Sequence, residues 1–156
     1  MTLRQRFTDD MKNAMREKDT LRLSTVRMIL AKLKDKDIEA RPSGNMDGIS
    51  EADILRMLET MIKQRQESAE MYRGGGSMDA AAKEEAEVAL IQAYMPKALS
   101  VEESAAAIQT LVTELGASSI KDMGKVMNEL RTRYAGQMDM GKAGELVKKA
   151  LSGQAA

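Results

Sequence analysis

The apolar residues of this chain recur at helical spacing along almost its whole length. The first such set comprises Leu3, Phe7, Met11, Ala14 and Met15. Residues spaced in this way fall on one face of an α-helix. No segment of useful length alternates apolar and polar residues as a half-buried strand does, and good helix formers dominate the composition. The sequence therefore predicts an all-α protein.

Turn-forming residues divide the chain into seven predicted helices. Both prolines, Pro42 and Pro96, stand at such breaks, and a proline disfavours helix at the residue before it. The predicted helices lie close to residues 3–17, 20–40, 51–73, 78–95, 101–115, 120–134 and 142–151. The break near Pro96 predicts an N-terminal bundle of about four helices in residues 1–98 and a C-terminal three-helix domain in residues 99–156.

Histidine and cysteine are both absent from the 156 residues. Their absence excludes disulfides, zinc sites of the usual Cys/His type, and Cys–His or Ser–His–Asp catalysis. No catalytic residue, metal site or cofactor is predicted. No apolar run approaches the roughly 18 residues needed to cross a membrane, and charged residues close to the start predict no signal peptide. We expect a cytoplasmic protein without a membrane or metal partner.

The overall charge is balanced, but its distribution is not. The chain has 24 basic and 24 acidic residues, which excludes nucleic-acid binding through a strong overall positive charge. Residues 1–36 nevertheless contain ten basic and five acidic residues. This segment is either a surface for phosphates or an ordinary solvated helix face.

Charged residues also occur where the helical pattern expects apolar ones. Arg65 falls in the middle of the apolar face of the third predicted helix, and Glu84 and Glu87 fall on or beside that of the fourth. A charge on a packed face needs a partner. We therefore expect a partly buried ion pair that joins Arg65 to Glu84 or Glu87. It either fixes the register of two helices or forms a site for a small ligand.

The sixth predicted helix carries a cluster of candidate phosphate-binding residues opposite its apolar face. The cluster comprises Lys121, Gly124, Lys125, Asn128 and Arg131. Lysines one turn apart repel each other mildly, and a helical glycine costs about 1 kcal/mol relative to alanine. The amides near Ser118 and Ser119 could also hold an anion. The alternative is an exposed polar face whose glycine packs on a neighbouring helix.

Five segments in a fixed order resemble the YqeY family, also called GatB/YqeY domain proteins. They are DMKNAM at 10–15, RLSTVR at 22–27, KQRQES at 63–68, YMPKALS at 94–100 and KDMGKVM at 121–127. Each segment alone is unspecific, whereas the ordered set covers nearly the whole chain. One departure is MDMGK at 138–142, where the family tends to have an Ala-Asp-Gly turn.

The resemblance implies an all-helical protein whose C-terminal domain is similar to the tail of the tRNA-dependent amidotransferase B subunit. That tail is associated with holding tRNA, and the stretch that matches it here is 118–130, with Lys121, Gly124 and Lys125. The implied function is a tRNA-associated accessory or binding module. The implied partners are tRNA and components of an amidotransferase or a tRNA synthetase.

Two alternatives remain open from the sequence. The resemblance also suggests a component of a glutamine-dependent carbon–nitrogen ligase. No Ser–Ser–Lys amidase arrangement or nucleotide-binding cradle is visible in the sequence. We therefore attribute the family's label of this activity to shared domain ancestry. The other alternative is a non-catalytic protein-interaction adaptor.

Overall fold

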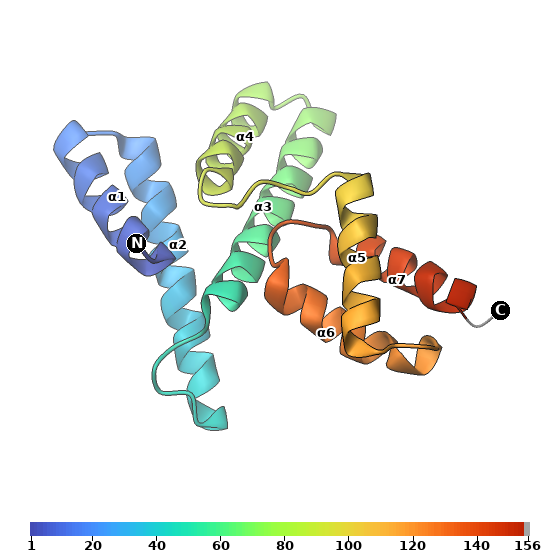
Figure 1. The fold of residues 1–156 in the computed structure, drawn as a ribbon. Coiled ribbons are helices and arrows are strands. Elements are labelled where there is room, and N and C mark those ends of the chain that lie inside the picture. The colour runs from blue at the N-terminus through green and yellow to red at the C-terminus, as the bar shows by residue number, and fades with distance from the viewer. Residues whose placement is uncertain (155–156) are drawn as a thin grey trace. The chain divides into compact units, whose positions relative to one another are not determined.

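The computed structural model describes residues 1–154, and within them the fold is entirely helical, as predicted (Figure 1). Seven α-helices and two short 3-10 helices make up this part of the chain. Their bounds are α1 Leu3–Glu17, α2 Thr20–Ala40, η1 Arg41–Ser43, α3 Glu51–Gly74, α4 Met78–Gln92, α5 Val101–Leu115, η2 Ile120–Asp122, α6 Met123–Arg133 and α7 Met140–Gln154.

Polar side chains determine where the helices begin. The hydroxyl of Thr2 accepts a hydrogen bond from the backbone amide of Gln5, and the Gln5 side chain accepts one from the amide of Thr2. Ser50 and Ser100 likewise accept from the amide three residues later. These bonds satisfy amides that have no partner inside the helix.

The fourth and seventh predicted helices have bounds that differ from the observed ones. Helix α4 ends at Gln92 rather than near residue 95, because the chain tightens into a turn in which the Tyr94 amide donates to the Ile91 carbonyl. Helix α7 begins at Met140, two residues early, because the Asp139 carboxylate accepts from the amides of Gly141 and Lys142.

The predicted sixth helix is divided into η2 and α6. The amide of Asp122 donates to the carbonyl of Ser119 at 2.9 Å, which is the i to i−3 bond of a 3-10 turn. Lys121 therefore lies in η2, whereas Gly124, Lys125 and Asn128 lie in α6. The candidate cluster begins on a tighter turn than a continuous α-helix would give.

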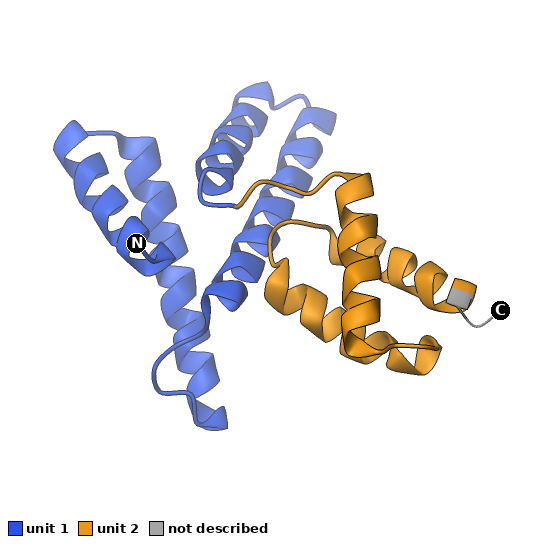
Figure 2. Ribbon diagram, viewed as in Figure 1, with its two compact units in different colours: residues 1–95 blue, residues 96–156 orange. Residues whose placement is uncertain are grey.

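The chain forms two compact units, Met1–Met95 and Pro96–Ala156 (Figure 2). Each unit has its own buried apolar cluster. The cluster of unit 1 contains Leu3, Phe7, Val26, Ile29, Leu33, Ile54, Met57, Leu58, Met61, Ile91 and Tyr94. The cluster of unit 2 contains Ile108, Leu111, Val112, Ala117, Val126, Met127, Leu130, Met138, Ala143, Val147 and Leu151.

Within unit 1 the helices pack mainly as two antiparallel pairs. Helix α1 lies along α2, and α3 lies along α4. Helices α2 and α3 contact each other much less and diverge from the connection between them (Figure 1). Within unit 2, each of α5, α6 and α7 packs against the other two.

Candidate nucleic-acid interface

The solvent side of η2 and α6 carries the predicted cluster. Lys121, Gly124, Lys125 and Asn128 are exposed, and Arg131 is half-buried. The opposite side of α6 is formed by the buried residues Val126, Met127 and Leu130. This burial orients the helix, so the polar side chains face solvent because the apolar ones occupy the core of unit 2.

The side chains of this surface differ in how far they are engaged. The ammonium of Lys125 donates to the Leu115 carbonyl at 3.2 Å and so caps the end of α5. Arg131 donates to the side-chain oxygen of Asn128 at 3.4 Å. Within residues 1–154, Lys121 makes no hydrogen bond or ion pair. The ammonium of Lys121 is therefore fully available to a ligand, whereas that of Lys125 would be shared between a ligand and the Leu115 carbonyl.

The anion site expected at the amides of Ser118 and Ser119 is already filled by the protein. The Asp122 carboxylate accepts from the amide of Ser118 at 2.9 Å and from that of Ser119 at 3.4 Å. These two bonds, assisted by the charge of Lys125, lower the pKa of Asp122 below its ordinary value. The expectation of an external anion at this position is therefore wrong, because a side chain four residues later takes its place.

The acidic residue within α6 has a cationic partner of its own. The Nε of Arg133 lies 3.7 Å from Oε2 of Glu129, which is ion-pair range but too long for a hydrogen bond. Arg133 also bonds to Glu114 of α5, with Nη1 and Oε2 2.6 Å apart. With Asp122 and Glu129 both engaged locally, the solvent side of η2 and α6 is left predominantly cationic.

Gly124 does not pack against a neighbouring helix. A Cβ placed on this residue would meet no other heavy atom within 4 Å. The alternative of a glycine required by helix packing is therefore contradicted for this position. The missing side chain instead leaves open backbone between Lys121 and Lys125.

A second predicted cluster lies in unit 1. The structure brings Arg65 of α3 and Glu87 of α4 together, with Nε 3.0 Å from Oε2. Arg65 also donates to the Met61 carbonyl at 3.2 Å. The pair involves Glu87 rather than Glu84, and it joins the two helices of one hairpin.

The contacts of Tyr94 were not predicted from the sequence. Its hydroxyl donates to the carboxylate of Asp10 in α1, and its ring packs edge-on against Phe7, with the centroids 4.8 Å apart. The guanidinium of Arg6 lies 5.0 Å above the same ring. Asp10 in turn accepts from Arg22 at 3.2 Å. The sequence indicated these contacts only through the position of Tyr94, a tyrosine at the end of an apolar helix face and close to the predicted break at Pro96.

Residues 1–154 include no group of three or more acidic side chains placed to hold a metal ion. None of the described helices is long and apolar enough to cross a membrane.

The all-helical fold and the ordered sequence motifs define a family of proteins to which this chain can be compared. A family model described as Yqey-like protein matches residues 4–151. The chain therefore belongs to the YqeY family, and the resemblance found in the sequence is confirmed.

Three curated relatives carry one name, "Altered inheritance of mitochondria protein 41, mitochondrial". The Eremothecium gossypii protein is 37% identical over 108 residues, which cover 68% of this chain and 57% of the relative. The Vanderwaltozyma polyspora protein is 35% identical over 86 residues, which cover 55% of this chain and 44% of that relative. The Lachancea thermotolerans protein is 33% identical over 112 residues, which cover 70% of this chain and 58% of that relative. The chain thus spans about half the length of these relatives.

The names of these relatives overturn the expectation of a cytoplasmic protein, because all three are described as mitochondrial. The physical basis of that expectation was too coarse. A lack of cysteine argues only that the fold needs no oxidising compartment, and this criterion does not separate one reducing compartment from another.

Proposed function

We propose that this YqeY-family protein is an accessory module that binds tRNA through the solvent side of η2 and α6. The observation that carries the proposal is the local charge balance of that surface. Lys121 and Lys125 flank an open stretch of backbone at Gly124. Glu129 is paired with Arg133, and the Asp122 carboxylate is turned toward the amides of Ser118 and Ser119. A polyphosphate ligand would therefore meet an excess of positive charge on this side.

The geometry suits contacts to a phosphate backbone rather than to bases. Lysine ammonium groups recognise phosphate as flexible point charges, and the position of Gly124 allows a strand to approach the helix closely. Asn128 and Arg131 extend the same side by one further turn. Contacts of this kind position a nucleic acid and carry little sequence information.

Titration of the full chain with a tRNA pool that includes mitochondrial tRNA, at several salt concentrations, tests the proposal. We expect binding at low salt that weakens steeply as salt rises. The variant Lys121→Gln/Lys125→Gln is expected to reduce the slope of log affinity against log salt by about 2, since each phosphate contact contributes about 0.9.

The matched control is Lys148→Gln/Lys149→Gln, which removes two exposed lysines from α7 of the same unit. It has the same net charge as the test variant and is expected to retain more of the salt dependence. Absence of tRNA binding at low salt, or equal losses in both variants, would reject the proposed surface.

A further inference from the structure

A second cationic feature lies in unit 1, where α2 and α3 diverge. A cavity of about 320 Å³ opens between these helices. Its lining includes Lys32 and Lys36 from α2 and Arg56 from α3, against Asp53 as the one acidic residue. The lining therefore carries two net positive charges. The proposed tRNA surface of unit 2 uses none of these residues.

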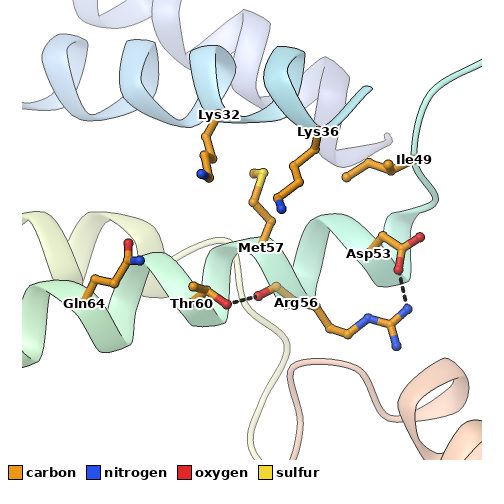
Figure 3. A pocket seen from close by; sticks show the side chains of 8 residues that line it. All are labelled: Lys32, Lys36, Ile49, Asp53, Arg56, Met57, Thr60 and Gln64. Carbon is orange, nitrogen blue, oxygen red and sulfur yellow. Dashed lines mark hydrogen bonds and ion pairs between the residues drawn. The ribbon is translucent and has the colours of Figure 1, made fainter. Parts of the chain in front are cut away.

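The two lysines direct their charge into the cavity. Figure 3 shows both side chains extending from α2 toward α3, one helical turn apart, with Met57 rising between them. Within residues 1–154, Lys32 has no hydrogen-bond or ion-pair partner, and Lys36 has a surface partner, Glu39, at 3.3 Å. Like charges at this spacing destabilise a helix, and an anion placed between them would relieve the repulsion.

The other charges of the cavity neutralise each other. Arg56 bonds to the Asp53 carboxylate, and Figure 3 shows its guanidinium turned away from α2. The cations left for a ligand are therefore the unpaired Lys32 and the surface-paired Lys36. Lysines hold phosphate as point charges, whereas planar carboxylates are matched best by arginine. A phosphate group fits these two lysines better than a carboxylate does.

The remainder of the lining is partly apolar and held in place. The backbone amide of Ile49 donates to Asp37 at 2.9 Å, and its carbonyl accepts from Arg4 at 3.0 Å. Both backbone groups of this wall are thus fixed before a ligand arrives. Met57 forms an apolar floor, and the Gln64 amide faces α2 as a further hydrogen-bonding group (Figure 3).

From these features we propose that the α2–α3 cavity binds a single nucleotide, with its phosphate between Lys32 and Lys36 and its sugar or base against Ile49 and Met57. The volume lies at the lower end of the roughly 300–1,000 Å³ typical of ligand pockets, which fits one nucleotide better than two. The nucleotide is either free or part of an RNA strand, since both present the same phosphate ester.

The test uses the full chain with 5′-AMP and, separately, with tRNA at low ionic strength. Calorimetry measures affinity, and the methyl resonance of Met57 reports where AMP binds. We expect AMP to shift this resonance and Lys32→Gln/Lys36→Gln to weaken binding by about tenfold or more, because two charge-assisted contacts are lost. Lys32→Arg/Lys36→Arg retains the charge and is expected to retain binding.

The matched control is Lys34→Gln/Lys63→Gln, which removes the same charge from exposed positions of α2 and α3 outside the cavity. Failure of AMP to bind, combined with a tRNA affinity reduced only in the cavity variant, would support the proposal and assign the nucleotide to RNA. Equal affinities of the cavity and control variants for both probes would overturn it. The AMP result does not involve Lys121 or Lys125, so it is independent of the proposed tRNA surface.

Discussion

Arg65 and Glu87 form an ion pair between α3 and α4 in which both residues are almost completely buried, with exposed fractions of 8% and 7%. Each charge has lost most of its contact with water, so each depends on the other for compensation. A pair of this kind contributes little net stability compared with apolar residues of similar size, but the loss of one partner is costly. We therefore expect the pair to act mainly by fixing how α4 lies along α3.

The first prediction concerns this pair. Glu87→Leu leaves the Arg65 guanidinium buried without its carboxylate, and we expect the free energy of unfolding to fall by about 3 kcal/mol. The double variant Arg65→Met/Glu87→Leu removes both charges and is expected to lie within about 1 kcal/mol of the parent. Urea denaturation measures both values. Glu84→Gln, on the same helix, is the control, and a double variant as unstable as the single one would contradict the argument.

The second prediction concerns the alkaline pH dependence of stability. Burial, reinforced by the hydrogen bond to Asp10, raises the pKa of Tyr94 above its ordinary value of 10.0. Above pH 10 the unfolded chain therefore loses this proton while the folded chain keeps it, so stability falls as pH rises, by up to about 1.4 kcal/mol per pH unit from this residue.

Tyr94→Phe removes this titration and leaves the ring packing intact. We expect the variant to be less stable than the parent at pH 7 by about 1–2 kcal/mol, since Asp10 loses a donor, and the difference to shrink above pH 10. All other titratable groups are the same in both proteins and cancel in the comparison. A difference that stays constant between pH 8 and 11 would show that the folded state does not retain the Tyr94 proton.

The third prediction separates stability from binding at one residue. Alanine fits at Gly124, because no heavy atom lies within 4 Å of the added Cβ. Gly124→Ala should therefore raise the free energy of unfolding of unit 2 by about 0.5–1 kcal/mol through helix propensity. If a phosphate backbone approaches this position, the same change should weaken tRNA binding. Thermal unfolding and tRNA titration give the two values, and a gain in both would contradict close approach.

The fourth prediction concerns the acid side. Two hydrogen bonds of 2.8 Å from Arg4 hold the pKa of Asp37 below its ordinary value. The stabilising contribution of this carboxylate is present above the unfolded pKa and is lost as pH falls through the folded one. Asp37→Asn should be less stable at pH 7 by about 1 kcal/mol, since both side chains are partly exposed.

The pH profile and a control complete this test. The difference between Asp37→Asn and the parent should diminish as pH is lowered below about 4, because the unfolded parent then gains the proton that Arg4 keeps off Asp37 in the folded state. Asp35→Asn removes an exposed carboxylate from the same helix and is expected to change stability little at any pH. Chemical denaturation at several pH values distinguishes the two variants.

The sequence predicted those features that depend on local periodicity. The spacing of Leu3, Phe7 and Ala14 placed α1 correctly, because burial of one helix face imposes a period of 3.6 residues. The arginine within the apolar face of α3 likewise indicated a buried partner on α4. Both inferences use only the position of a residue around its own helix.

Features that depend on contacts between distant segments were not predicted. Tyr94 and Asp10 are 84 residues apart, and no periodicity relates them. The α2–α3 cavity depends on where two helices diverge, which the apolar pattern of either helix does not encode. The filling of the Ser118 amide by Asp122 was missed, although Ser119 and Asp122 have the three-residue spacing of a capping box.

The interiors of the two units are built from separate stretches of sequence, one ending before Pro96 and the other beginning after it. A gene rearrangement that cut the coding sequence at this point would sever no buried apolar cluster. Each half of the chain therefore carries a complete apolar interior, so either half can be joined to a different polypeptide without changes to that interior.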